Sequence, residues 1–123
     1  MENRTPEINE LLPLTAAVFQ ILLALADQER HGYGIMQEVA AMTQNQVQMG
    51  PGTLYGTIKR MLNARLIAES DERPDPELDD ERRRYYRLTD WGQQVLAAET
   101  QRLSALVSVA QTKRVFGGAG GGV

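Results

Sequence analysis

The sequence predicts a mainly α-helical protein with one small β-hairpin, and three features lead to this prediction. Apolar residues recur at helical spacing in several segments of the 123-residue chain. A short apolar run at 66–68 and a basic, aromatic run at 82–88 flank a polar loop, as in two strands joined by a hairpin. The length and the 42% hydrophobic content allow a single small domain with a modest core.

The N-terminal third is predicted to contain two helices. An apolar stripe marks the first helix, and its members are Leu14, Val18, Ile21, Leu22 and Leu25, widened by Phe19 and Leu23. A helix that is apolar over most of its circumference needs burial on two sides. We therefore expect its own domain on one side and a partner chain on the other. The second helix is expected from about Tyr33 to Met42, with Ile35 and Val39 buried.

Two polar segments flank this second helix. Residues 27–32 are expected to form a turn, because glycines at 32 and 34 surround Tyr33. His31 is the only histidine of the chain, and one histidine cannot build a metal site. We therefore predict that His31 hydrogen-bonds the turn. Residues 43–48 connect to the next helix and are a candidate for a short third strand.

The segment from Pro51 to Leu62 is predicted to be an amphipathic helix. Pro51 suits a first helical turn, where an N–H has no intrahelical partner. The apolar face consists of Leu54, Ile58, Met61 and Leu62, and the opposite face of Gly52, Thr53, Gly56, Lys59, Arg60 and Asn63. Gly56 costs about 1 kcal/mol relative to alanine, which close approach of another backbone or of DNA would explain. The small and basic face is typical of a DNA-recognition helix, although ordinary surface helices share this pattern.

A hairpin is predicted to follow this helix. Residues 66–68 suit a strand, and residues 70–82 form a polar, acidic loop that contains two prolines. In the second strand, Tyr86 and Leu88 alternate with Tyr85 and Arg87, so that the two pairs lie on opposite faces. The arginines at the base of the hairpin, Arg82, Arg83 and Arg84, are placed to reach phosphates or a minor groove. Charged residues also protect exposed sheet edges, and the two interpretations are compatible.

The C-terminal part is predicted to be one helix over residues 89–116. Thr89 and Asp90 are expected to form its N-cap, with Gln93 at capping-box spacing from Asp90. Apolar residues spaced like those of a coiled coil follow, although Glu99 interrupts them; they are Leu96, Leu103 and Ala110, with Leu106 between. We expect this helix to mediate dimerisation. Residues 117–123 are glycine-rich and are expected to be flexible.

A helix pair, a recognition helix and a basic hairpin together describe a winged helix-turn-helix domain. The pattern resembles the PadR-like transcriptional regulators from Leu14 to about Leu103. The residues that carry the resemblance are His31-Gly32-Tyr33-Gly34-Ile35, Pro51, Leu54-Tyr55, Arg60, Leu66-Ile67 and Tyr85-Tyr86-Arg87-Leu88-Thr89 with Gly92. The sequence departs from the family at Leu62, where an acidic residue is usual, and at Arg65, where glycine commonly ends the helix. Arg65 is therefore expected to adopt a left-handed backbone conformation or to end the helix differently.

The resemblance implies a winged helix-turn-helix domain over residues 1–88, with the wing at about 67–88, and a dimerisation helix over 89–116, as in the short subfamily. It also implies a homodimer on a palindromic operator, with its recognition helices roughly 34–36 Å apart. The expected dimer interface comprises Phe19, Leu23, Leu96, Leu103, Leu106 and Ala110. A small hydrophobic effector at this interface would contact Phe19, Trp91 and Leu103, although Trp91 is better explained as an anchor of the helix to the core.

The leading functional hypothesis is a sequence-specific DNA-binding repressor. Its expected DNA contacts are Thr53, Tyr55, Lys59, Arg60, Arg82, Arg83 and Arg84. The alternative is a winged-helix module that binds an acidic protein partner and has no operator preference. An enzyme is disfavoured, because the chain has no cysteine, a single histidine and no phosphate-binding loop. No catalytic residue, metal site or cofactor is expected.

The distribution of charge reconciles an acidic chain with DNA binding. The net charge is −3 and the pI about 5.1. Residues 50–67 nevertheless carry +3 and residues 82–87 carry +4, whereas residues 68–81 carry −7. We expect the acidic loop to swing clear of the duplex. Neither a signal peptide nor a membrane span is recognisable, so a cytoplasmic location is expected.

Overall fold

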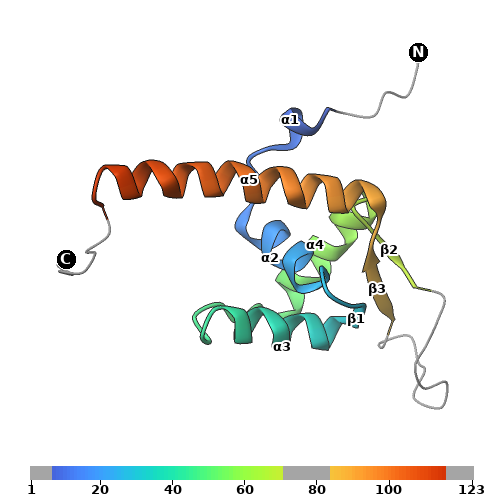
Figure 1. Ribbon diagram of the computed structural model, residues 1–123. Helices are drawn as coiled ribbons and strands as arrows, with labels where there is room; N and C mark the ends of the chain where they lie inside the picture. Colours follow the sequence, from blue (N-terminus) through green and yellow to red (C-terminus); the bar gives the residue numbers. More distant parts are fainter. Residues whose placement is uncertain (1–6, 71–83, 116–123) are drawn as a thin grey trace.

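A computed structural model describes residues 7–70 and 84–115 and confirms a mainly helical fold with a small sheet. The elements, in chain order, are α1 (Ile8–Leu11), α2 (Ala16–Ala24), β1 (Arg30–His31), α3 (Gly32–Met42), α4 (Pro51–Asn63), β2 (Ile67–Glu69), β3 (Tyr85–Leu88) and α5 (Asp90–Thr112). The long helix α5 crosses the domain, and its C-terminal half extends beyond the domain on one side (Figure 1). The sheet lies on the other side, near the start of α5.

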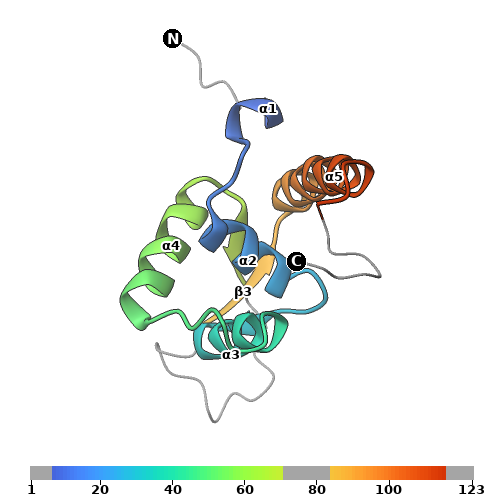
Figure 2. The ribbon, with the colours of Figure 1, turned by 90° about the vertical axis from the view of Figure 1, so that its left-hand side faces the viewer.

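The core lies among α2, α3, α4 and the first half of α5. Helix α2 lies between α4 and α5 when the molecule is turned (Figure 2), and it packs against both. The buried apolar side chains come from every one of these helices and from the sheet; they include Ile21, Leu22, Ile35, Val39, Leu54, Ile58, Met61, Ile67, Tyr86 and Val95. The apolar stripes predicted for α2, α3 and α4 therefore face one common core.

Capping residues fix where α2 and α3 begin. Thr15 is the N-cap of α2, and its hydroxyl accepts a hydrogen bond from the Val18 N–H at 3.2 Å. His31 is the N-cap of α3, and its Nδ1 accepts a hydrogen bond from the Gly34 N–H at 3.0 Å. His31 thus has the structural role predicted for it, but its hydrogen bond caps the first turn of α3, and residues 30–31 form strand β1 instead of part of the predicted turn.

The sheet has three antiparallel strands in the order β1-β3-β2. Arg30 and His31 pair with Tyr86 and Tyr85, so the third strand precedes α3. The prediction of a third strand at 43–48 was wrong. Two successive residues in that segment adopt positive φ angles, 50° at Gln44 and 64° at Asn45, which turn the chain instead of extending it.

The end of α4 confirms the left-handed conformation that was one of the two predictions for Arg65. Its φ angle is 63°. The Arg65 N–H donates to the Leu62 carbonyl and the Leu66 N–H donates to the Met61 carbonyl, each at 3.0 Å. These bonds satisfy carbonyls that would be unpaired at a helix end, so the helix ends as it would with a glycine here.

Helix α5 begins at a single capping residue. Thr89 is the N-cap and accepts a hydrogen bond from the Gly92 N–H at 2.9 Å, whereas the predicted capping box from Asp90 to Gln93 is not seen. The Thr89 hydroxyl also lies 2.7 Å from the Arg65 carbonyl oxygen, which ties α5 to the end of α4. The helix ends at Thr112, before the predicted position 116. Residues 117–123 lie outside the described residues.

Candidate nucleic-acid interface

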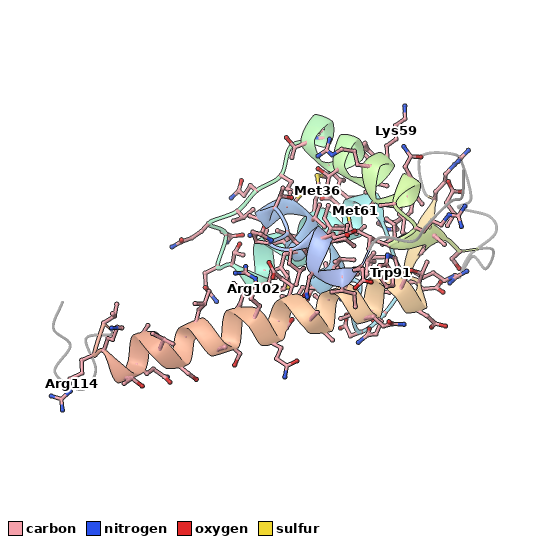
Figure 3. The ribbon with its side chains drawn as sticks, turned by 90° about the horizontal axis from the view of Figure 1, so that it is seen from above. Met36, Lys59, Met61, Trp91, Arg102 and Arg114 are labelled. Atoms are coloured by element: carbon pink, nitrogen blue, oxygen red, sulfur yellow. The ribbon has the colours of Figure 1, made fainter. Side chains whose placement is uncertain are left out.

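One face of α4 is uncovered by the described parts of the chain. Thr53, Lys59 and Arg60 are exposed on it, and the Lys59 side chain extends away from the body (Figure 3). A Cβ atom built at Gly52 would meet no heavy atom within 4 Å. At Gly56 its nearest neighbour would be the Arg60 guanidinium, at 3.8 Å. No backbone of the described chain therefore requires glycine at position 56, and the space above it is open to an external partner.

The opposite face of α4 anchors the helix in the core. Leu54, Ile58 and Met61 are buried, as predicted, and Thr57 is buried with them. The Thr57 hydroxyl accepts a hydrogen bond from Arg60 Nη2 at 3.1 Å, so a buried group holds the guanidinium at the edge of the exposed face. Thr57 was not among the residues predicted for either face of α4, although its spacing of three from Leu54 places it near the apolar face.

Tyr55 links α4 to the start of α3. Its side chain is 42% exposed, and its ring lies over Gly32. A Cβ atom at Gly32 would lie 2.7 Å from Tyr55 Cζ, so a larger residue there would displace the Tyr55 ring. Tyr55 is thus part of the exposed face and also contacts the start of α3.

An aromatic row that was not predicted from the sequence connects α3 with the wing. His31 stacks on Tyr33 with ring centroids 6.5 Å apart and meets the edge of Tyr85 at 5.2 Å. Tyr33 is 60% exposed. Gly32 and Gly34, on either side of Tyr33, lie in the first turn of α3, and the row depends on the long-range pairing of His31 with Tyr85, which no local pattern reveals.

The wing strand alternates as predicted. Tyr86 faces the core and Arg87 is exposed. Burial raises the pKa of the Tyr86 phenol, and the nearby Glu69 carboxylate raises it further. Arg84 is exposed and pairs with Glu69 at 3.0 Å, a surface ion pair that salt or a phosphate can replace. Arg82 and Arg83 lie outside the described residues.

Of the residues expected at a dimer interface, all but Leu96 are at least partly exposed in the single chain. Leu23 and Leu106 are exposed, and Phe19, Leu103 and Ala110 are partly buried. Leu96 is buried within the single chain at 4% exposure, so its side chain supports the core of the subunit. Trp91 is partly buried and packs against the core, as expected of an anchor (Figure 3).

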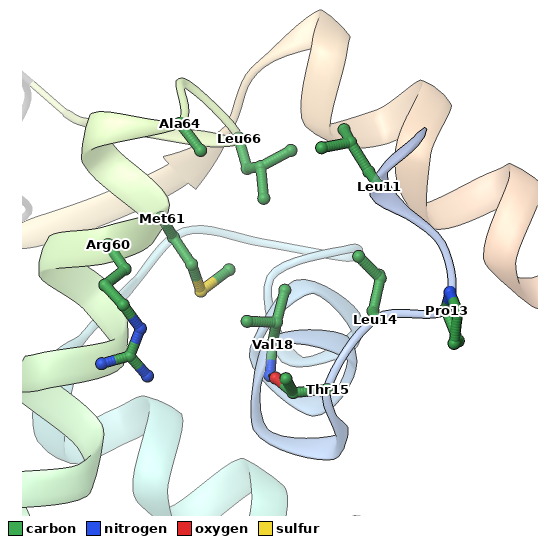
Figure 4. A pocket seen from close by; sticks show the side chains of 9 residues that line it. All are labelled: Leu11, Pro13, Leu14, Thr15, Val18, Arg60, Met61, Ala64 and Leu66. Atoms are coloured by element: carbon green, nitrogen blue, oxygen red, sulfur yellow. The ribbon is translucent and has the colours of Figure 1, made fainter. Parts of the chain in front are cut away.

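A cavity of about 230 Å³ lies beside Arg60. It opens between the segment that leads into α2 and the C-terminal half of α4 (Figure 4). Its lining is mostly apolar and consists of Leu11, Pro13, Leu14, Thr15, Val18, Arg60, Met61, Ala64 and Leu66. Phe19, Trp91 and Leu103, the residues expected to contact an effector, are not among these lining residues.

Neither a metal-binding cluster nor a membrane-spanning helix occurs among the described residues. No group of three or more histidine, cysteine, aspartate or glutamate side chains in residues 7–70 and 84–115 is arranged to hold a metal ion. Within the same residues, no helix has the length and apolar content needed to cross a membrane.

Sequence comparison identifies relatives of the chain. The profile of the transcriptional regulator PadR-like family matches residues 21–98. An uncharacterised 37.1 kDa protein in transposon TN4556 of Streptomyces fradiae is 30% identical over 86 residues, which are 70% of this chain and 22% of that protein. An uncharacterised protein X of Lysinibacillus sphaericus is 31% identical over 77 residues, which are 63% of this chain and 68% of that protein. The chain thus spans about a fifth of the first relative.

Solved structures share the fold. A PadR family transcription regulator from Clostridium difficile is 25% identical, with a TM-score of 0.62, over 78% of this chain and 95% of that chain. A PadR-like transcriptional regulator from Bacillus cereus is 21% identical, with a TM-score of 0.64, over 85% of this chain and 92% of that chain. The second similarity is one of fold alone.

Proposed function

The chain belongs to the PadR-like family of transcriptional regulators, and we propose that it is a repressor that binds a palindromic operator as a homodimer in the cytoplasm. The observation that carries this proposal is the uncovered face of α4. Small residues at 52, 53 and 56 let a duplex come close to the helix, and Lys59 and Arg60 supply positive charge beside them. A helix with this face fits a major groove about 12 Å wide.

The contacts divide by their chemistry. Thr53 and Arg60 are assigned to base edges, because a hydroxyl serves as donor or acceptor and a guanidinium pairs with guanine in a bidentate manner. Lys59 is assigned to a phosphate, since a flexible ammonium acts as a point charge. Tyr55 supplies a hydroxyl on the same face, and Arg84 marks the base of the wing. Arg82 and Arg83 remain part of the proposed wing contact.

The second half of α5 supports the homodimer. Leu106, Val107 and Val109 are about half exposed there, although they are apolar. Exposed apolar residues along one projecting helix form a surface that a second copy of the helix would bury. A twofold dimer joined in this way presents two recognition helices to successive turns of DNA.

We also propose that a small hydrophobic effector, held near Phe19, Trp91 and Leu103, releases the protein from the operator. Trp91 is the only tryptophan of the chain, so its fluorescence reports on this region alone. Titration with planar apolar compounds is expected to give a specific, saturable change in emission. The absence of such a change over a panel of compounds would remove the effector from the proposal and leave DNA binding intact.

Selection from a random DNA pool tests the function as a whole. The purified chain is expected to enrich one sequence with twofold symmetry and half-sites about one helical turn apart. Enrichment of no sequence would favour the alternative, a module whose basic face binds an acidic protein partner.

A further inference from the structure

Glu99 is the unusual residue of α5. It lies between Leu96 and Leu103 in the apolar pattern of the helix, and its side chain is only 2% exposed although it carries a carboxylate. A buried carboxylate is costly unless it is paired, and an apolar residue of similar size generally packs there at lower cost. Core stability alone therefore does not explain why a carboxylate is found at this position.

The partners of Glu99 come from two places. Arg102, on the same helix, donates from Nε to Oε1 at 2.6 Å and from Nη2 to Oε2 at 3.0 Å. The Leu14 backbone N–H donates to Oε2 at 3.0 Å, across 85 residues of sequence. We call Glu99, Arg102 and Leu14 the α5 joint. The hydrogen bonds of the α5 joint depend on direction, whereas apolar contacts would let α5 shift along the domain at little cost.

The α5 joint lies where α5 leaves the domain. Glu99 is the last buried residue of the helix, and the apolar residues beyond it at 106, 107 and 109 are exposed. On the other side of the joint, Leu14 immediately precedes Thr15, the N-cap of α2. The Leu14 side chain also lines the cavity beside Arg60 and Met61 of α4 (Figure 4). The joint thus connects the projecting half of α5 with the segment that packs next to the recognition helix.

We propose that Glu99 is a positioning residue that sets the angle between α5 and the DNA-reading domain, and thereby the separation of the two recognition helices in the dimer. This inference rests on the proposed homodimer and adds the element that determines its operator spacing. Buried polar groups fix one geometry among several that apolar contacts would allow, as single polar residues do in coiled coils.

The test measures helix separation without DNA. The chain contains no cysteine, so Asn63→Cys places one spin label per subunit on the exposed end of α4. Double electron–electron resonance on the full chain then gives the distribution of distances between the two labels. With Glu99 intact, we expect one narrow distribution, centred near the roughly 34–36 Å of one DNA turn after allowance for the label.

Two variants probe the joint. Glu99→Gln keeps a near-isosteric oxygen that accepts from Leu14 but loses the charge that holds Arg102, and Glu99→Leu removes both. We expect the distribution to broaden or shift in Glu99→Gln and to do so further in Glu99→Leu. Gln94→Leu is the matched control, because it makes a similar change at an exposed position of the same helix and is expected to leave the distribution unchanged.

The outcomes distinguish a failure of the proposal for Glu99 from a failure of the proposed homodimer. If both variants retain the narrow distribution, the proposal for Glu99 is overturned. If Glu99→Gln does not fold while Gln94→Leu does, Glu99 serves folding and the positioning role is also overturned. If the labelled chain with Glu99 intact gives no intersubunit distance, the homodimer itself is contradicted, irrespective of Glu99.

Discussion

At the scale of single residues, the face of α4 combines openness with anchoring. Gly52 and Gly56 leave space in front of the helix, while Thr57 holds the Arg60 side chain from behind through one hydrogen bond of 3.1 Å. Tyr55 packs on Gly32 at the start of α3. Arg60, which is proposed to contact DNA, is therefore held by a buried residue, and this reduces the entropy that its side chain loses on binding.

Lys59→Ala tests the assignment of Lys59 to a phosphate. We expect weaker binding to operator and random duplex alike. The salt dependence of binding is expected to decrease by about one unit, because one phosphate fewer is neutralised. Binding measured by fluorescence anisotropy across a salt series provides both numbers.

Thr53→Ala is the contrasting variant. If Thr53 contacts a base, this change also reduces the preference for operator over random duplex, by up to about 1–3 kcal/mol. An equal loss of affinity on both duplexes would contradict base reading by Thr53.

Gly92→Ala tests the close approach of α5 to the rest of the domain. A Cβ atom at Gly92 would collide with the Leu66 carbonyl oxygen and lie 2.9 Å from the carbonyl carbon, and a backbone cannot move away as a flexible side chain can. We expect the free energy of unfolding in urea to fall by at least about 1–3 kcal/mol. Gly52→Ala is the control, since its Cβ would meet no atom within 4 Å, and it is expected to leave stability unchanged or raised. Equal stability of both variants would contradict the close approach.

At the scale of elements, the first half of α5 packs on the domain and the second half projects from it. The ionised carboxylate of Glu99 helps to hold the first half in place. The hydrogen bond from Arg102 lowers the pKa of the Glu99 carboxyl below its ordinary value of 4.5; burial opposes this effect, and the Leu14 N–H reinforces it. A depressed pKa in the folded state means that the carboxylate stabilises the fold above the unfolded pKa. This contribution is lost as the pH falls through the folded pKa.

Glu99→Gln tests this pH dependence. The difference in unfolding free energy between the unchanged chain and the variant is expected to be full at pH 7 and to shrink below about pH 4.5, the ordinary pKa of the carboxyl. Urea unfolding curves above and below that pH provide the comparison. A difference that stays constant over this range would show that the charge of Glu99 adds nothing to stability.

Sequence patterns predicted those elements whose signals are local. Pro51 and the spacing of Leu54, Ile58 and Met61 located α4, and the alternation at 85–88 located β3. Strand β1 has only two residues, and its pairing with Tyr85 and Tyr86 joins segments far apart in the chain, so no local pattern reveals it. Glu99 looked like an interruption for the same reason, because the Leu14 N–H that satisfies it is 85 residues away.

At the scale of the whole molecule, charge and shape support the same assembly. The chain is acidic overall, but positive charge is concentrated in the sequence at 50–67, which includes α4, and at 82–87, which includes the start of β3. The exposed apolar residues of α5 lie on the part that projects from the body (Figure 1). A dimer through α5 would bury this apolar surface and leave the exposed face of α4 uncovered.

Leu106→Asp tests the dimer. Leu106 is 54% exposed in the single chain, so the change leaves the core intact, but it would place like charges opposite each other at the interface. We expect sedimentation to show a monomer at concentrations where the unchanged chain is a dimer. Leu106→Met is expected to remain dimeric, and a dimer of unchanged strength in Leu106→Asp would place the interface elsewhere.

DNA reading by α4 is tested by the affinity for a selected duplex and for its scrambled counterpart, each measured across a salt series. We expect a preference for the symmetric duplex of about 10³-fold or more near physiological salt. We also expect the affinity to fall steeply as salt increases, because several phosphates are neutralised. Equal affinity for both duplexes at every salt concentration would contradict sequence-specific DNA binding and assign the basic face of α4 to another partner.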